Sequence, residues 1–521
     1  MKVSGKLFMY VIIVMVIAPV FSLIFYSNPN SINVIFEKKN IFFESSSNTI
    51  YLLLITVISS LVLGLIPSWF VSLYKFRFRN IIDFLMYLPL AIPTYIMAFS
   101  YGEILSYTGP FQSFLRNNFD FLAPFFNIDF LTLEVLGIIL GLSLFPYVYA
   151  ASRISFTLVG KSFLNLSKTL GNNWIETFLK VVIPLSAPAI ISAIFLVSME
   201  VLNEYGAVKY FGVNTFTTEI FKTWYALSDE TTAAGLSIFL LTIVFILFSV
   251  EYVYNSKLKF NYKLNTDLNY IDHKQKTSLF PYIFSFFPIF FGFVIPLSFI
   301  IYNVIDNFKI IDFNDLSSFT FNSVFLSFIS SFFIVIFLLL VLFIDNEYKS
   351  KISKTLSAVT SLGYVLPGAV LGLSLIIFSR FIGDNLISYS LTGTYFLLFY
   401  ALFIRFMAVG RSPLKSSIDK IPISLFDTAK NLGLGSFNLL KKIYVPLNKF
   451  ALFSAFMLCF IDIMKELPIT LILRPFNFDT LSTKTYELAV EEMVDISSFY
   501  SLVIIIICSL TLYFVKKINT N

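Results

Sequence analysis

Two stretches of the chain repeat one pattern: residues 170–185 read LGNNWIETFLKVVIPL, and residues 432–447 read LGLGSFNLLKKIYVPL. They align without a gap, and the same spacing continues into the apolar segments that follow. The matched pairs are Gly171 with Gly433, Pro184 with Pro446, Glu200 with Asp462 and Glu204 with Glu466. After three further residues the run NTFTTEIFKTW, from residue 214, meets DTLSTKTYELA, from residue 479. This order and spacing indicate an internal duplication.

The composition identifies the environment in which the duplicated chain folds. Of its 521 residues, 57% are hydrophobic and only 13% are charged, and the mean hydropathy is +0.83. A water-soluble core cannot hide so large an apolar fraction, so the composition excludes a soluble enzyme. The net charge of +6 is small, and in a membrane protein it is typical of cytoplasmic loops rather than of nucleic-acid binding.

A bilayer core about 30 Å thick needs roughly 20 apolar residues per helix, and the chain contains about twelve such segments. Lipid offers no hydrogen-bond partner to open backbone groups, so we predict an all-α polytopic membrane protein with two homologous six-helix halves. Three prolines, Pro93, Pro146 and Pro367, fall inside predicted spans and are expected to kink them. The predicted spans are 8–25, 49–70, 81–101, 131–151, 185–205, 233–254, 280–304, 321–344, 356–378, 391–409, 447–467 and 497–515.

The distribution of Lys and Arg predicts the topology. These residues concentrate in the N-terminus, in every second loop and in the C-terminus, which satisfies the positive-inside rule if both termini are cytoplasmic. The duplication predicts a first transmembrane repeat at 1–254, a cytoplasmic linker at 255–279 and a second repeat at 280–521. Because both halves have six spans, they are parallel repeats related by a pseudo-twofold axis along the membrane normal. We therefore predict that a translocation pathway runs along that axis.

The repeated segments fall in cytoplasmic loops, and each is predicted to form a helical hairpin. A glycine can end the first helix in a left-handed conformation. Apolar residues recur at helical spacing before each glycine, so the helices are amphipathic. Such a helix is suited to dock into a groove of another protein, although an interfacial helix lying on lipid remains the alternative. The loop residues that we single out are Ser167, Lys168, Leu170, Gly171, Pro184, Asp427, Ala429, Leu432, Gly433 and Pro446.

These loops resemble the "EAA" loops in membrane subunits of binding-protein-dependent ABC importers, in which the glycine and the downstream Pro-Leu keep this spacing. The first copy departs from the pattern, with Asn165 at its acidic position, and the second follows it better through Asp427. Residues 198–224 and 461–492 narrow the likeness to fused two-repeat permeases of ferric iron importers. The resemblance implies that each loop is a coupling helix seated on one ATP-hydrolysing subunit.

The resemblance also implies partners and a location. The chain has no Walker A sequence, so ATP and Mg²⁺ would belong to a partner dimer of ATP-binding subunits at the cytoplasmic face. A periplasmic binding protein would deliver the cargo at the outer face. The implied location is a bacterial cytoplasmic membrane, where lipid surrounds the chain, and no nucleic-acid partner is expected. No catalytic residue and no cofactor are predicted within the chain itself.

The acidic residues of the duplicated spans form the second candidate site. Glu200 and Glu204, like Asp462 and Glu466, are spaced i, i+4 and therefore share one helical face. One interpretation is a translocation pathway whose carboxylates attract a hard cation, without a stably bound metal. The alternative is structural pairing with Lys209 and Lys465, or with helix ends at the interface, since pairing is the usual fate of acids inside membranes.

Two other classes of transporter stay open on the sequence. An importer for thiamine, a polyamine, a phosphonate or another small solute would share the cytoplasmic loops. A secondary transporter driven by protons or sodium could also have twelve spans and intramembrane carboxylates, and it would need no ATPase. A membrane enzyme is disfavoured, because the single histidine, His273, lies in the linker, and Cys459 and Cys508 lie inside apolar runs.

Overall fold

The computed structural model describes residues 2–26, 39–119, 129–257, 271–272, 279–348, 353, 357, 359–384 and 391–520. Within these ranges the regular secondary structure is helical apart from two parallel two-residue strands, β1 (Tyr74–Lys75) and β2 (Ile271–Asp272). The predicted all-α class is therefore confirmed. Most of the predicted linker at 255–279 lies outside the described residues.

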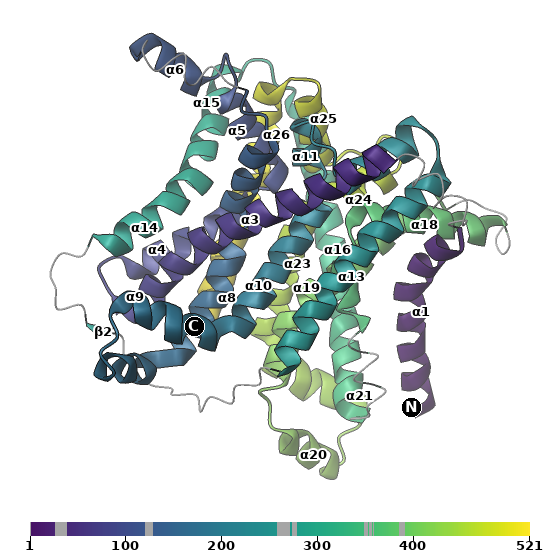
Figure 1. Cartoon of the computed structure of the whole chain (residues 1–521). Helices are drawn as coiled ribbons and strands as arrows, with labels where there is room; N and C mark the ends of the chain where they lie inside the picture. Colours follow the sequence, from purple (N-terminus) through teal and green to yellow (C-terminus); the bar gives the residue numbers. More distant parts are fainter. Residues whose placement is uncertain are drawn as a thin grey trace.

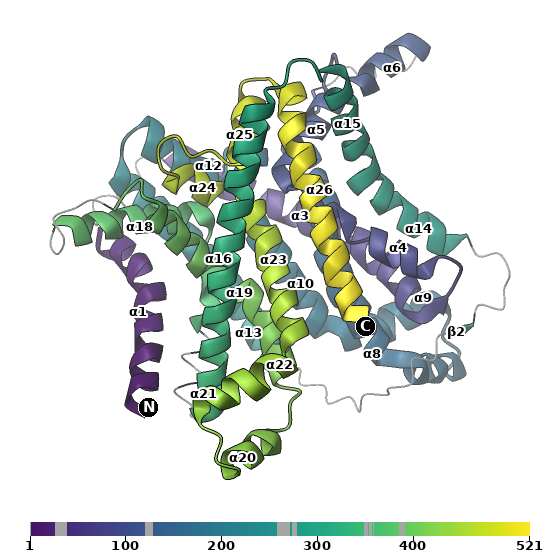
Figure 2. The same ribbon diagram turned by 180° about the vertical axis from the view of Figure 1, so that it is seen from behind.

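The helices of the first half alternate between long apolar segments and short connecting turns. They are α1 (Lys2–Tyr26), α3 (Lys39–Leu73), α4 (Arg79–Leu85), η1 (Leu88–Ala91), α5 (Thr94–Leu105), α6 (Pro110–Asn118), α8 (Leu133–Thr169), α9 (Trp174–Thr177), η2 (Phe178–Val182), α10 (Ile183–Asn203), α11 (Gly206–Tyr210), α12 (Phe216–Phe221), η3 (Lys222–Ala226) and α13 (Glu230–Lys257). Figures 1 and 2 show the long helices gathered into one bundle.

The second half repeats this order. Its helices are α14 (Phe280–Ile289), η4 (Phe290–Val294), α15 (Ile295–Asp306), α16 (Phe313–Tyr348), η5 (Leu362–Val365), α18 (Gly368–Ile382), α19 (Tyr395–Ile418), α20 (Ile423–Asn431), α21 (Ser436–Leu439), η7 (Leu440–Tyr444), α22 (Val445–Leu447), α23 (Lys449–Met464), α24 (Pro468–Leu473), α25 (Leu481–Val490) and α26 (Val494–Thr520). The short α11 and α12 of the first half thus correspond to α24 and α25 of the second.

About twelve spans were predicted, and the described residues account for them in three forms. Eight helices are long and apolar enough to cross a membrane, and two bent helix pairs pass the same test. The bent pairs are Arg79–Ala91 with Thr94–Asn118, at 88°, and Ser436–Leu447 with Lys449–Met464, at 75°. Two shorter apolar helices, Val14–Tyr26 and Gly368–Ile382, correspond to the predicted first and ninth spans.

The third and ninth predicted spans are wrong as continuous helices, and proline explains both breaks. Pro93 and Pro367 precede α5 and α18 as their N-cap residues, with extended backbone (ψ 145° and 142°). A 3-10 turn, η1 or η5, comes before each proline. Proline has no N–H and fixes its own φ, so it begins a helix more easily than it continues one. Only Pro146 of the three lies inside a helix, α8.

Tertiary hydrogen bonds repeat between the halves and support the predicted duplication. A threonine capping box begins both α12 and α25, at Thr215 and Thr480. A buried hydroxyl of α3 or α16 then accepts the first N–H of each of these helices. The pairs are Phe216 N–H to Thr49 Oγ1, 3.2 Å, and Leu481 N–H to Ser323 Oγ, 2.7 Å. The two halves therefore share this contact between a short helix and a long one.

The first helical segment of each half packs against the other half. In the first half, α1 lies beside α18 (Figure 1), and its Met15 carbonyl accepts a 2.5 Å hydrogen bond from Tyr400 Oη of α19. In the second half, the Phe291 carbonyl of η4 accepts a 2.5 Å hydrogen bond from Tyr101 Oη of α5. This exchange ties the halves together at their rims.

Candidate translocation cavity and repeated loops

The membrane helices α10 and α23 each end one or two residues before a glutamate, Glu204 for α10 and Glu466 for α23. Glu204 follows α10 with extended backbone (φ −68°, ψ 125°), and its Oε1 accepts the N–H of Ala207, 2.9 Å away, in the short helix α11. Glu466 does the same for Ile469 of α24, at 3.0 Å. The first N–H groups of a helix have no partner within it, so each carboxylate caps the helix that follows it.

These helix ends meet the proline turns of the opposite half. Gly368, at the start of α18, donates its N–H to Asn203 Oδ1 of α10, 2.7 Å away. A Cβ added at Gly368 would lie 3.0–3.1 Å from polar atoms of Asn203, Arg405 and Glu466. Glycine at this position therefore allows the backbone to approach the polar centre closely.

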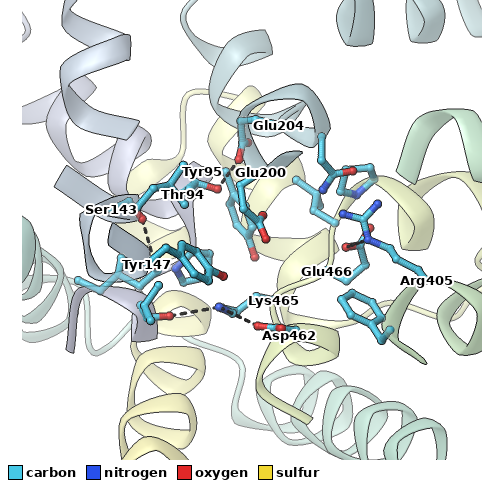
Figure 3. A pocket seen from close by; sticks show the side chains of 18 residues that line it. Thr94, Tyr95, Ser143, Tyr147, Glu200, Glu204, Arg405, Asp462, Lys465 and Glu466 are labelled. Carbon is cyan, nitrogen blue, oxygen red and sulfur yellow. Dashed lines mark hydrogen bonds and ion pairs between the residues drawn. The ribbon is translucent and has the colours of Figure 1, made fainter. Parts of the chain in front are cut away.

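A polar cavity of ≈ 70 Å³ lies where these elements meet. That volume holds several water molecules, since about 10–15 Å³ is enough for one. All four acids predicted from the sequence line it, and Figure 3 shows them together with two cations, Arg405 and Lys465. The lining residues are Leu90, Ile92, Pro93, Thr94, Tyr95, Ser143, Leu144, Tyr147, Glu200, Asn203, Glu204, Arg405, Phe406, Asp462, Lys465, Glu466, Leu467 and Pro468.

Each acid of the cavity has a polar partner. Glu204 accepts a hydrogen bond from Thr94 Oγ1, and Glu200 accepts one from Tyr364 Oη. Asp462 pairs with Lys465, Oδ1 to Nζ 3.4 Å. Burial of an unpaired charge is costly, so these partners explain how the carboxylates are tolerated between membrane helices.

The deepest ion pair of the cavity joins Arg405 to Glu466. Arg405 is 3% exposed and Glu466 is 6% exposed. The Nε and Oε2 atoms lie 3.5 Å apart, so the pair is held by charge more than by a hydrogen bond. Arg405 Nη1 also donates to the Leu366 carbonyl, 3.2 Å away, in the turn before Pro367. The guanidinium thus joins α19, α23 and the proline turn of the second half.

The sequence raised the alternative that Lys209 and Lys465 pair with the acids, and the structure shows such a pair for Lys465. Lys465 pairs with Asp462, whereas Lys209 is exposed on α11 and does not line the cavity. Among the described residues no group of three or more His, Cys, Asp or Glu side chains is placed to hold a metal ion. The carboxylates gather in one cavity, but in this conformation they are paired with protein groups.

Several polar residues in or beside the cavity escaped the sequence prediction. Arg405 carried a usable signal, because an ionisable residue inside an apolar span marks a candidate functional site. Asn203, Thr94 and Tyr364 carried none, since small polar residues and tyrosines are common throughout the spans. Their roles depend on the proline turns, which bring the start of α5 and α18 against the ends of α10 and α23.

The first of the two repeated loops forms the predicted hairpin. Helix α8 runs to Thr169, Gly171 adopts a left-handed conformation (φ +81°), and α9 begins three residues later. Asn173 caps α9 through a capping box with Glu176. Ser167 is buried, and its hydroxyl lies 2.9 Å from that of Thr177, which holds the two helices together. Leu170 projects at the tip of the hairpin, 79% exposed.

The second loop has the same geometry at its glycine. Gly433 has φ +82°, and Leu432 before it is 78% exposed. On α20 Asp427 is exposed, whereas Ala429 is buried and faces the protein. Among the other predicted loop residues, Lys168 lies in the last turn of α8, and Pro184 and Pro446 stand in the first turns of α10 and α22.

Both loops present apolar residues at the tip of a fixed turn. Nothing within 4 Å would contact a Cβ at either glycine, so the positive φ alone accounts for glycine at both positions. In both views α9 and α20 lie toward the end of the molecule where the two termini lie (Figures 1 and 2). The matched turns and exposed leucines fit a pair of docking elements, although their role stays a prediction.

A duplicated helical membrane body with a polar cavity between its halves defines a transport protein, and sequence comparison gives its family. The family of binding-protein-dependent transport system inner membrane components matches residues 60–259. Over this part, less than half of its length, the chain is similar to permeases that work with a binding protein, and it is a multi-pass inner membrane protein. It is a transport subunit rather than an enzyme, and ATP hydrolysis belongs to a separate subunit.

Individual relatives give more detail. The chain is 24% identical over 491 residues to the Fe(3+)-transport system permease protein FbpB 2 of Haemophilus influenzae, which covers 91% of this chain and 90% of the relative. It is 28% identical over 160 residues to the sulfate transport system permease protein CysT of Salmonella typhimurium, covering 30% and 55%. The molybdate/tungstate permease WtpB of Methanocaldococcus jannaschii is 26% identical over 202 residues, covering 38% and 76%.

Proposed function

We propose that this chain is the fused permease subunit of an ABC importer that carries ferric iron, delivered by a periplasmic binding protein. The observation that carries the proposal is the match to the Haemophilus influenzae iron permease, which extends over 91% of this chain. The sulfate and molybdate relatives match only 30% and 38% of it. Similarity through both halves therefore supports a cargo related to that of the iron permease.

The charge of the cavity supports a cationic cargo over an oxyanion. Four carboxylates face two cations there, which leaves a formal excess of two negative charges. A dianion such as sulfate or molybdate would be repelled at short range, because charges interact strongly in a cavity of low dielectric. We propose that Glu200, Glu204, Asp462 and Glu466 line the translocation pathway. Thiamine and polyamines are also cations, so they remain rival cargoes.

We further propose how the chain is driven. Two ATP-binding subunits, which hold ATP and Mg²⁺, dock at the loops around Gly171 and Gly433 on the cytoplasmic side, where both termini also lie. Their closure on ATP moves the loops together, and the halves rotate about the pseudo-twofold axis to open the cavity alternately to each side. The exposed leucines at the loop tips, Leu170 and Leu432, support apolar docking there.

Uptake of radiolabelled iron tests the proposal. Cells expressing the permease with its ATPase should accumulate ⁵⁵Fe³⁺, and cells with an ATPase inactive in hydrolysis should not. ATPase-independent uptake would favour the secondary transporter, and uptake of sulfate, thiamine or a polyamine without iron would overturn the cargo.

A paired substitution tests the pathway. The double variant Glu204→Gln with Glu466→Gln should reduce iron uptake while its association with the ATPase is retained. The matched control is Glu491→Gln, because Glu491 is exposed at the end of α25 and lies outside the cavity. Unchanged uptake in the double variant would remove these carboxylates from the pathway.

A further inference from the structure

The two halves exchange polar contacts across the centre of the molecule. Lys465, at the end of α23 in the second half, donates from Nζ to the Leu90 carbonyl of η1 in the first half, 3.2 Å away. The same ammonium lies 3.4 Å from Asp462 Oδ1 in its own half. Lys465 therefore has one partner on each side of the boundary between the halves, and Figure 3 shows it beside Asp462.

The first half makes matching contacts in the opposite direction. Asn203 is the counterpart of Lys465 in the first half. Each residue directly precedes the capping glutamate of its half. Its Oδ1 accepts the N–H of Gly368, 2.7 Å away, in the second half. Glu200 accepts a hydrogen bond from Tyr364, which stands three residues before Pro367, as Leu90 stands three residues before Pro93.

These reciprocal contacts join the end of a membrane helix in one half to the proline turn of the other. Apolar packing follows the same boundary, because a Cβ at Gly206 in the first half would lie 2.8 Å from Leu467 Cδ2 in the second. Separation of the halves must therefore break the bond from Lys465 to Leu90. The contact of Lys465 with Asp462 lies within one half and survives that separation.

We propose that Lys465 is a latch residue that holds the two halves together beside the cavity. A hydrogen bond from a charged donor is stronger than one between neutral groups, so Lys465 contributes more to closure than the bond from Gly368 to Asn203. The inference deepens the proposed transport cycle and rests on it, since a latch has meaning only if the halves move apart.

Distance measurements between spin labels test the latch. Tyr225 in the first half and Phe476 in the second are 54% and 91% exposed, and each would be replaced by a labelled cysteine. Native Cys459 and Cys508 are 0% exposed and stay unlabelled in the folded protein. The full chain would be studied in nanodiscs by pulsed electron resonance, without cargo.

The variant Lys465→Met should shift the distribution toward longer distances. A charge-assisted hydrogen bond predicts a fall of roughly ten- to hundredfold in the ratio of closed to open molecules. Lys465→Arg, which keeps a cationic donor, should stay near wild type. The matched control Lys222→Met removes an exposed lysine that pairs with Glu219 outside the cavity, and it should leave the distribution unchanged.

The double variant Asp462→Asn with Lys465→Met separates the latch from a simple charge effect. Lys465→Met alone leaves Asp462 without its cation, and that carboxylate could force the halves apart by drawing in water. If the double variant remains open, the lost bond to Leu90 is the cause. If it closes again, or if Lys465→Met never opens, the latch is overturned. These distances need no cargo, so failure of iron uptake would instead overturn the proposed function.

Discussion

Replacement of Arg405 by Met should destabilise the protein more than any comparable change at its surface. Arg405 is 3% exposed, and its removal leaves Glu466 buried without a cation. Removal of one partner of a buried ion pair costs about 3–5 kcal/mol. The low end, about 3 kcal/mol, applies here because the 3.5 Å contact lacks hydrogen-bond geometry and because Glu466 keeps the N–H of Ile469.

The two native cysteines provide the assay. Cys459 and Cys508 are 0% exposed, so a thiol-reactive fluorophore reports their exposure as the purified protein is heated in detergent. The matched control is Arg380→Met, which breaks the pair with Glu230 at the surface, where Arg380 is 50% exposed. Surface pairs contribute only about 0–1 kcal/mol. The unfolding midpoint should therefore fall much further for Arg405→Met than for Arg380→Met.

A second variant separates the loss of charge balance from the loss of packing. Arg405→Met combined with Glu466→Gln removes both charges, and the glutamine oxygen can still accept the N–H of Ile469. Most of the lost stability should return, because the buried unpaired charge is gone. Equal midpoints for Arg405→Met and wild type would refute the reasoning. A double variant no more stable than the single one would show that the guanidinium acts by packing alone.

Three further changes have defined outcomes. Gly368→Ala places a Cβ against three polar side chains of the cavity and should lower iron uptake while co-purification of the ATPase stays at the wild-type level. Gly171→Ala and Gly433→Ala each force a side chain into a left-handed conformation at a cost of about 1–2 kcal/mol, and they should weaken co-purification of the ATPase. Asn173→Ala removes a capping box worth about 0.5–2 kcal/mol and should make the first loop more susceptible to limited proteolysis than Asn438→Ala, at an exposed position in the second loop.

The sequence was sufficient for the features that depend on periodicity. Long apolar runs predict membrane helices, and ten candidate spans with two shorter apolar helices lie where twelve were predicted. The duplication also predicted left-handed glycines at Gly171 and Gly433, because a glycine between two amphipathic helices is the usual way to end the first. These features are local, so a residue and its neighbours are enough to determine them.

The sequence was not sufficient for the breaks and partners at the centre. An apolar run around Pro93 or Pro367 looks the same whether the chain crosses the membrane in one helix or turns halfway. The partners of the acids follow from that turn, since Thr94 and Gly368 begin the helices after the two prolines. The i, i+4 spacing of Glu200 and Glu204 predicted a shared face, but Glu204 lies just beyond the end of α10, where the chain bends.

Fusion of the halves gives this cavity a charge that an identical pair could not have. Ser143 and Arg405 make equivalent contacts, to the carbonyls of Ile92 and Leu366, each just before the proline of its turn. Only the second half carries cations there, Arg405 and Lys465. Two copies of the first half would leave four carboxylates with no cation, and two copies of the second would balance four with four. One copy of each leaves an excess of two negative charges, which suits transient attraction of a cation better than either extreme.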